Sequence, residues 1–342
     1  MITERLTDPP KIDPAHVAGI LASGKTATIQ FSKPCYNAEI LSQIDALCLQ
    51  YGNVIEVRFY GHYSSIFDAS HLALISNVQW LSIDCLMRIT AIEHLFRLTK
   101  LRRLSIGVFE LDLPEILAQI HMTDIRELYL CETRKSNIDL APLSQYPNLK
   151  SLYIASHSNG FPVLKELGNL TELRLRSLSK KQPLDILTHI PKLDKLELIL
   201  GGRSNIDEFS HEKLSDLAIV RVLGFMRIGN LNRFPALQKL RIEDQIKLES
   251  IDLENAPACL RRLALLNCKK LRQIGRMDHL AKLDHLRISR TDIDCDALLA
   301  SPLPSSLRTV GLYTGSRKAN AVYRAKLDAL GYAEFTKSPG LA

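Results

Sequence analysis

The sequence predicts an α/β solenoid, in which short parallel strands alternate with short helices or turns and stack into one long sheet. Three observations support this fold class. A six-residue apolar pattern recurs twelve times at a nearly constant interval, leucine supplies 58 of the 342 residues, and apolar and polar residues alternate within each copy. Repetition at a fixed period of about 20 to 50 residues is the sequence signature of stacked repeat architectures.

The repeated pattern has the form L-x-x-L-x-L, and successive copies begin 21 to 24 residues apart. The copies are VIEVRF at 54, VQWLSI at 78, LRRLSI at 101, IRELYL at 125, LKSLYI at 149, LTELRL at 170, LDKLEL at 193, LSDLAI at 214, LQKLRI at 237, LRRLAL at 260, LDHLRI at 283 and LRTVGL at 307. The alternation within each copy has the period of a strand. One such strand cannot bury its apolar face alone, so we expect the copies to stack as parallel strands about 4.8 Å apart.

Over residues 54–314 these copies resemble the repeats of the leucine-rich repeat family, whose period is about 20 to 29 residues. The resemblance implies a stand-alone horseshoe with a parallel concave sheet of about 12–13 strands and short helices or turns on the convex side. The ninth position of the repeats departs from the family pattern, because only Cys268 matches the Asn or Cys that is common there. We therefore expect no asparagine ladder and irregular turns.

Two caps are expected to cover the apolar ends of the repeats. Residues 1–53 are predicted to form an N-terminal helix-strand-helix cap, residues 54–314 the twelve repeats, and residues 315–342 a C-terminal helical cap and tail. The stretches NAEILSQIDALCLQYG and SRKANAVYRAKLDALGYAEF are predicted as helices of these caps. With 28 residues after Thr314, we expect no catalytic domain.

The stretch GILASGKT, residues 19–26, matches the phosphate-binding loop G-x-x-x-x-G-K-[ST]. A working loop of this kind follows a strand and leads into a helix, whose N-terminus faces the phosphates. Here Asp13-Pro14 predicts the start of a helix before the motif, Gly24 predicts its end, and TATIQF predicts a strand after it. This order is the reverse of the required one. We therefore predict no nucleotide binding, and a thirteenth strand at the edge of the sheet.

The other partial motifs favour a protein that is not an enzyme and holds no metal or cofactor. HEKLS at 211 lacks the second histidine of a zinc motif, and DIDCDA at 292 lacks the glycine and the distal glutamate of a calcium loop. The seven cysteines are widely spaced without C-x-x-C, which favours reduced thiols. With no signal peptide and no long apolar stretch, we predict a soluble cytoplasmic protein without a membrane partner.

The outward strand positions carry the candidate binding residues. In this family the second, third, fifth and seventh positions line the concave face, and Trp, Tyr and Arg dominate binding hot spots. Tyr129, Tyr153 and Arg174 would form one row of two aromatics and a cation. The alternative is that such residues are ordinary β-surface residues with favourable cross-strand packing. The predicted partner-binding residues are Arg58, Tyr60, Trp80, Arg103, Tyr129, Tyr153, Arg174, Arg176, Arg241, Arg287 and Tyr313.

The charge of this face bears on the partner. Its 48 positions hold 14 Lys/Arg and 9 Asp/Glu with interspersed signs, in a chain of net charge +7. A phosphate-tracking groove needs a denser stripe of one sign, so nucleic acid is the weaker partner. We predict a non-catalytic module that binds a protein with an acidic or mixed-charge surface, as a cytosolic inhibitor or toxin-immunity-like protein does. The alternatives are a basic nucleic-acid-binding solenoid, a scaffold or effector protein, and a nucleotide-dependent switch.

Overall fold

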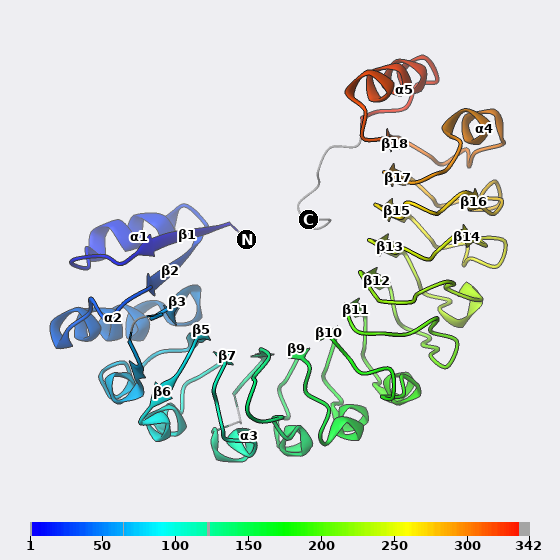
Figure 1. The fold of residues 1–342 in the computed structure, drawn as a ribbon. Helices are drawn as coiled ribbons and strands as arrows, with labels where there is room; N and C mark the ends of the chain where they lie inside the picture. The colour runs from blue at the N-terminus through cyan, green and yellow to red at the C-terminus, as the bar shows by residue number, and fades with distance from the viewer. Residues whose placement is uncertain (1, 64, 122–123, 335–342) are drawn as a thin grey trace. The chain divides into compact units, whose positions relative to one another are not determined.

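The chain folds as two units of repeated strands, Met1–Leu170 and Thr171–Ala342. The computed structural model describes residues 2–63, 65–121 and 124–334. In each unit a strand is followed by a turn and, in most repeats, by a short helical or extended segment before the chain returns to the next strand (Figure 1). The strands therefore lie along one side of each unit, and the helical segments lie along the other (Figure 1).

Unit 1 contains seven strands that pair in parallel in the order of the chain. They are β1 (Thr3–Thr7), β2 (Thr26–Phe31), β3 (Ile55–Tyr60), β5 (Trp80–Leu86), β7 (Arg103–Val108), β8 (Glu127–Leu130) and β9 (Ser151–Ala155). The helical segments are α1 (Pro14–Ala22), α2 (Ala38–Tyr51), η1 (Gly52–Val54), η2 (Ala69–Leu74), η3 (Ile92–Arg97), α3 (Ile116–Gln119), η4 (Ala141–Gln145) and η5 (Phe161–Glu166). A separate parallel pair joins β4 (Phe67–Asp68) and β6 (Ile89–Thr90).

Unit 2 also contains seven strands that pair in parallel in chain order. They are β10 (Glu172–Arg176), β11 (Lys195–Ile199), β12 (Asp216–Val220), β13 (Lys239–Glu243), β15 (Arg262–Leu266), β17 (His285–Ser289) and β18 (Thr309–Tyr313). Its other segments are η6 (Asp185–His189), η7 (Leu231–Arg233), α4 (Cys295–Ala300), α5 (Arg317–Ala329) and the pair of β14 (Ser250–Ile251) with β16 (Gln273–Ile274). Every one of the twelve predicted repeats contains a strand, so the predicted α/β solenoid is confirmed.

The described residues contain fourteen strands of this kind, and the prediction of 12–13 is therefore too low. β2 is the additional strand that the sequence predicted, but β1 lies beyond it. Polar contacts help to attach β1: Thr3 Oγ1 lies 2.8 Å from Thr26 Oγ1, and Lys25 Nζ donates to Glu4 Oε2 at 2.9 Å. The segment TERLT has a single apolar residue, so apolar periodicity cannot reveal such a strand.

The GILASGKT stretch has the order that the sequence predicted. The carboxylate of Asp13 caps α1 by accepting hydrogen bonds from the main-chain N–H groups of Ala15 and His16. Gly24 follows the helix in the left-handed conformation with φ 77°, and β2 begins at Thr26. The chain therefore enters the Lys-Thr end of the motif from a turn and leaves it as a strand.

The inward strand positions form the core of each unit. Leu104 and Leu128 in unit 1 and Leu173 in unit 2 are completely buried, and nearly all their equivalents are buried to the same degree. Phe31 and Phe59 stack with ring centroids 5.7 Å apart. Full burial of one such side chain contributes about 1.5–3 kcal/mol, so stacking the repeats supplies most of the stability. The outward side chains do not pack into the core, so their identities can vary between repeats.

The eighth position of most repeats turns the chain out of its strand in the left-handed conformation. The residues that do so are Gly61, Cys85, Ser156, Ser177, Leu200, Arg221, Asp244, Asn267 and Arg290. For a residue with a Cβ this conformation costs about 1–2 kcal/mol, and only one of the nine is glycine. The turns of these nine repeats thus share one backbone conformation at this position, although the sequence led us to expect irregular turns.

Candidate partner-binding face

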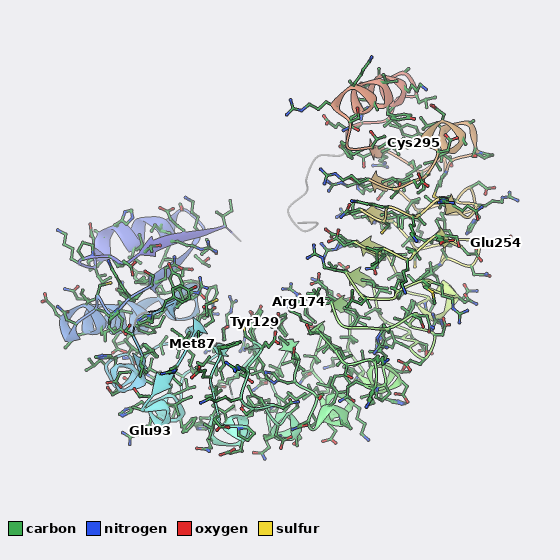
Figure 2. All side chains as sticks on the ribbon, viewed as in Figure 1. Met87, Glu93, Tyr129, Arg174, Glu254 and Cys295 are labelled. Carbon is green, nitrogen blue, oxygen red and sulfur yellow. The ribbon has the colours of Figure 1, made fainter. Side chains whose placement is uncertain are left out.

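Outward side chains at the third, fifth and seventh positions of the repeats form what we call the strand face of each unit. In β3 the inward Val57 and Phe59 are buried, whereas Arg58 between them is half-buried. Figure 2 shows Tyr129 on the strand side of unit 1 and Glu93 on the side of the helical segments. All eleven predicted binding residues lie on the strand face of one unit or the other, and none is buried.

Two neighbouring tyrosines form a tilted ring pair on the strand face of unit 1. Tyr129 on β8 pairs in register with Tyr153 on β9, and their ring centroids lie 6.1 Å apart. This spacing lies within the range of favourable aromatic pairs. The positions that continue the row on β7 and β5 are the small residues Ser105 and Ser82. The ring pair therefore borders a low, flat area that a partner surface can cover.

Trp80 and Arg103 form the second aromatic feature of unit 1. The Arg103 guanidinium carbon lies 4.7 Å from the centre of the Trp80 ring, and its Nε lies 3.1 Å from Glu127 Oε1. A guanidinium over an indole contributes about 0.5–1 kcal/mol when partly exposed. Arg103 is therefore held between a ring and a carboxylate, in a fixed orientation.

Arg58 is bound more tightly within the unit. Its Nε donates to Asp84 Oδ1 at 2.8 Å, its Nη1 donates to Gln30 Oε1 at 3.3 Å, and its guanidinium lies 4.5 Å from the centre of the Tyr60 ring. Burial opposes the charged form of Arg58, but the hydrogen bond and charge of Asp84 outweigh it and raise the pKa above its ordinary value. These contacts across three strands favour a structural role for Arg58 beside any role in binding.

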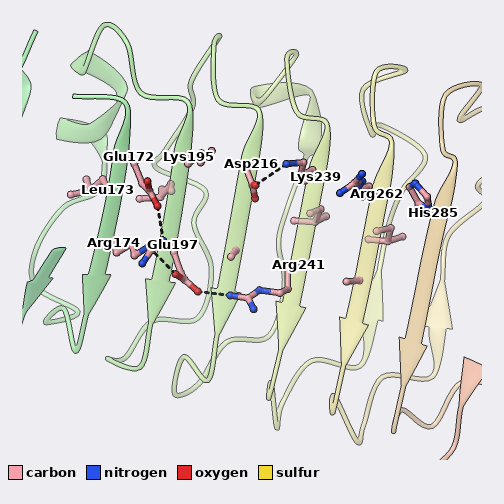
Figure 3. Close-up of a pocket in the computed structure, with 15 residues that line it drawn as sticks. Glu172, Leu173, Arg174, Lys195, Glu197, Asp216, Lys239, Arg241, Arg262 and His285 are labelled. Atoms are coloured by element: carbon pink, nitrogen blue, oxygen red, sulfur yellow. Dashed lines mark hydrogen bonds and ion pairs between the residues drawn. The ribbon is translucent and has the colours of Figure 1, made fainter. Parts of the chain in front are cut away.

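A shallow groove of about 330 Å³ crosses the strand face of unit 2 (Figure 3). At its start Glu197 on β11 lies between two arginines: Arg174 Nε is 3.5 Å from Glu197 Oε2, and Arg241 Nη2 bonds Glu197 Oε1. Arg174 also donates to Glu172 at 2.6 Å. Ala218 occupies the row position between Glu197 and Arg241, and its small side chain lets Arg241 reach across β12.

The far end of the groove is more basic. Arg262 on β15 and His285 on β17 are row neighbours, and Ala264 lies on the groove floor beside Arg262. Burial lowers the pKa of His285, Asp284 opposes this shift, and the positive charge of Arg262 adds to the lowering. His285 is therefore kept neutral more easily than an exposed histidine.

The remaining predicted residues also lie in unit 2. The Arg287 guanidinium carbon lies 5.7 Å from the centre of the Tyr313 ring, and Arg176 is exposed at the end of β10. Arg174 belongs to unit 2, where it contacts two glutamates, whereas the tyrosine pair belongs to unit 1. The predicted row of two tyrosines and Arg174 therefore stays a prediction.

One cluster resembles the hydroxyl-imidazole-carboxylate arrangement of hydrolases. His285 Nδ1 contacts Thr309 Oγ1, and its Nε2 lies 3.4 Å from Asp284 Oδ1. However, Asp284 is already bound by Arg261 at 2.8 Å, and the main-chain N–H of Thr309 donates to a main-chain oxygen within the sheet. An oxyanion site needs such N–H groups to be available. The geometry therefore favours a hydrogen-bonded surface cluster.

Comparison with solved structures identifies the architecture. Internalin inlF from Listeria monocytogenes is similar to this chain at 17% identity and a TM-score of 0.55, over 91% of this chain and 87% of the internalin. The chain has the leucine-rich repeat fold. The functional domain of InlJ from the same organism is similar at 13% identity and a TM-score of 0.43, over 74% of this chain and 66% of that domain. No family model matches the sequence, and no curated protein matches it.

The ninth position of these leucine-rich repeats carries buried polar side chains other than asparagine. His157 is buried, donates from Nε2 to Cys131 O at 2.9 Å, and accepts at Nδ1 from the N–H of Ile138 at 3.2 Å. Gln245 is also buried and donates to Ile219 O, in the preceding repeat, at 3.1 Å. Side chains longer than asparagine thus connect neighbouring turns, and a partial ladder exists without asparagine.

Sequence reasoning missed the charged groove of unit 2. It ranked Trp, Tyr and Arg by residue type, and so passed over Glu197, Ala218, Arg262 and Ala264, which decide the shape and charge of the groove. The fifth-position row carries the signal that could have found it. In that row Ala218 and Ala264 each lie beside Arg241. Only Ala218 also lies beside a glutamate, Glu197.

Other site classes find no support in the part of the chain that the structure describes. Within residues 2–63, 65–121 and 124–334, no group of three or more His, Cys, Asp or Glu is arranged to hold a metal ion. No helix in those ranges is long and apolar enough to cross a membrane. No disulfide joins the seven cysteines, which all lie in the described residues, and burial raises the pKa of Cys48 to about 12 and that of Cys268 to about 11. These two thiols therefore stay protonated and unreactive near neutral pH.

Proposed function

We propose that this leucine-rich repeat chain is a non-catalytic module that binds a partner protein on its strand face. In the finer form of the proposal, the chain is an inhibitor or toxin-immunity-like protein that acts by covering a surface of its partner. We place it in the cytoplasm, because seven cysteines without a disulfide suit a reducing compartment. The proposal includes no cofactor and no nucleotide.

The tyrosine pair is the observation that carries the proposal. Tyr129 and Tyr153 keep half-exposed rings beside the small side chains of Ser82 and Ser105, on a sheet whose backbone is already fixed by stacking. Aromatic side chains held in this way bury a large area on binding and lose little conformational entropy. Such a surface suits contact with another folded protein.

The groove in unit 2 supports a protein ligand over a small molecule. Small-molecule sites are mostly apolar cavities with a few polar groups. This groove is shallow, and its third-position row presents the charged or titratable side chains of Glu172, Lys195, Asp216, Lys239, Arg262 and His285. A lining of this kind complements the polar and charged surface of a folded protein. It therefore supports the predicted partner with a mixed-charge surface.

The test uses the double variant Tyr129→Ala/Tyr153→Ala. Immobilised wild-type protein is used to capture a partner from an extract of the source cells, and the affinity of the purified partner is then measured for each variant. Loss of a hot spot costs about 2 kcal/mol or more, so we expect binding at least about thirtyfold weaker. The control is Tyr63→Ala, which removes a tyrosine that is 85% exposed in the turn after β3 and should leave the affinity unchanged.

Two results would contradict the proposal in different ways. If wild type and the double variant bind the partner equally, the strand face of unit 1 is not the binding site. If the wild-type chain captures no partner that survives purification, the chain is not a binding module of this kind.

A further inference from the structure

The fifth-position row of unit 2 places small residues between charged ones. Along β10 to β18 the row holds Arg174, Glu197, Ala218, Arg241, Ala264, Arg287 and Gly311, each in register with the next. Neighbouring strands of a sheet lie about 4.8 Å apart, so residues two strands apart are separated by roughly 9–10 Å. Each alanine therefore leaves a gap into which a side-chain head group can fit.

The first gap is filled from within the chain. Over Ala218, the carboxylate of Glu197 meets the guanidinium group of Arg241, and Arg174 approaches the same carboxylate at 3.5 Å from the other side. Figure 3 shows this chain of arginine, glutamate and arginine along the row. A carboxylate between two guanidinium groups is thus an arrangement that this sheet already stabilises.

The second gap has an arginine at each border and no carboxylate beside it in the row. Ala264 lies between Arg241 and Arg287, and the third and fifth positions of β13, β15, β17 and β18 contain no Asp or Glu. The guanidinium group of Arg262, on the same strand as Ala264, makes no hydrogen bond or ion pair with the residues that the structure describes, and its charge adds to the lowering of the pKa of His285. Arg262 therefore brings to the second gap a positive charge that pairs with no carboxylate among the described residues.

We propose that the gap over Ala264 binds a carboxylate from an acidic segment of the partner protein, with Arg262 as the principal ligand. The partner's Asp or Glu takes the place over Ala264 that Glu197 holds beside Ala218, and Arg241 and Arg287 border it on either side. A guanidinium group offers parallel N–H donors that match a carboxylate, which makes this the natural acceptor. This inference rests on the proposed function and specifies which partner chemistry the strand face of unit 2 selects.

The surroundings favour an acidic protein segment over a nucleic-acid backbone. At the third, fifth and seventh positions, β13, β15, β17 and β18 hold four Lys/Arg and one Asp/Glu, whereas β10, β11 and β12 hold three Lys/Arg and three Asp/Glu. The basic area thus spans four strands, roughly 15 Å. A phosphate chain needs a continuous basic track, and Glu172 and Asp216 at the start of the groove would repel it. A short run of carboxylates fits within the basic area.

The experiment measures binding of fluorescent peptides to the full chain by anisotropy. The probes are a decapeptide of alternating Asp, Glu and Gly, its Asn and Gln counterpart, and a single-stranded oligothymidylate of similar length. We expect the acidic peptide to bind at least about tenfold more tightly than the neutral one, with an affinity that falls as salt rises. Arg262→Gln should weaken this binding about five- to tenfold. Ala264→Glu should nearly abolish it, because the variant supplies the missing carboxylate from within the chain.

The matched control is Arg97→Gln, which removes one exposed positive charge at the end of η3 in unit 1 and should change the affinity less than about twofold. Ala264→Glu should unfold at the wild-type denaturant concentration or a higher one, so its loss of binding is not loss of fold. The inference is overturned if both groove variants bind the acidic peptide like wild type, if the neutral peptide binds equally well, or if oligothymidylate binds more tightly than the acidic peptide. If these peptides fail while the captured partner still binds through the tyrosine pair, the proposed function stands and only this inference falls.

Discussion

The strand faces of the two units differ in how they satisfy charge. In unit 1, Arg103 is held between the Trp80 ring and the carboxylate of Glu127, so each charge has a local partner. In unit 2, Arg174 and Arg241 share the carboxylate of Glu197 and each contacts one further glutamate, and the strands beyond Ala218 carry an excess of positive charge. Unit 1 thus offers aromatic area with balanced charge, and unit 2 offers charge that a partner can complete.

This difference arises although both units use the same scaffold. Inward leucines and isoleucines are buried alike in both, and the left-handed eighth position recurs in both. The inward positions therefore specify the fold, and the outward positions are read in rows whose members lie about 4.8 Å apart. What one side chain can bind depends on the size and charge of its neighbours in the row, because a small neighbour opens a gap and a large one closes it.

The comparison of the two strand faces assumes that both units are stabilised by buried ladder residues. Gln245 is the ladder residue of unit 2 and is completely buried, with hydrogen bonds to Ile219 O and Glu243 O. Gln245→Ala removes these donors, and we expect the free energy of unfolding to fall by about 2 kcal/mol. Denaturant unfolding measures the change, with Gln238→Ala, at an exposed outward position, as the control. Equal stability of both variants would show that unit 2 does not depend on a ladder.

The charge contrast itself can be tested with two matched substitutions. Glu197→Gln leaves Arg174 and Arg241 facing each other without their shared carboxylate, so we expect a loss of about 1 kcal/mol that shrinks at high salt. Glu127→Gln removes one partner of Arg103, which keeps the Trp80 ring, so we expect a change within about 0.5 kcal/mol. Urea unfolding of both variants at low and high salt gives the comparison. A larger loss of stability for Glu127→Gln than for Glu197→Gln would contradict the contrast, because the charges of unit 1 would then depend more on their carboxylate than those of unit 2 do.

The sequence predicts the fold because the fold depends on residues that repeat. Leucines at fixed spacing specify the strands, and a helix start, a glycine and an alternating segment correctly predict the helix-turn-strand order around GILASGKT. β1 escapes prediction because polar contacts such as Thr3 with Thr26 help to attach it. The ladder escapes prediction because histidine and glutamine take the place of asparagine, and a search for residue identity does not recognise equivalent hydrogen bonding.

The candidate site is less predictable because it depends on neighbours. The outward location of the eleven residues follows from strand alternation alone. Whether an arginine is engaged depends on the neighbouring strands: Arg58 is held by Asp84 on β5, whereas the guanidinium group of Arg262 has no such partner among the described residues. Side-chain reach over a small residue, as with Arg241 over Ala218, requires the register of three strands. That register becomes certain only once the repeats are stacked.

The smallest expected difference between the units is in their response to acid. His157 holds the ladder position in unit 1 that Gln245 holds in unit 2, and its Nδ1 accepts from the N–H of Ile138 only when the ring is neutral. Burial lowers the pKa of His157 below the ordinary value of about 6.5, so the unfolded chain takes up a proton at a higher pH than the folded protein does. Its contribution to stability is therefore complete above about pH 7 and is lost as the pH falls below about 6.5.

His157→Gln should place the non-titrating residue of unit 2 in unit 1. We expect the drop in the free energy of unfolding between pH 7.5 and pH 5.5 to be about 1 kcal/mol smaller in this variant than in wild type. Guanidinium unfolding at several pH values measures it, and His189→Gln, at an exposed histidine of η6, should keep the wild-type dependence. The remaining dependence should come in part from His62 and His285, whose pKa values burial also lowers. An unchanged slope in His157→Gln would mean that the acid response of the repeats does not pass through the ladder.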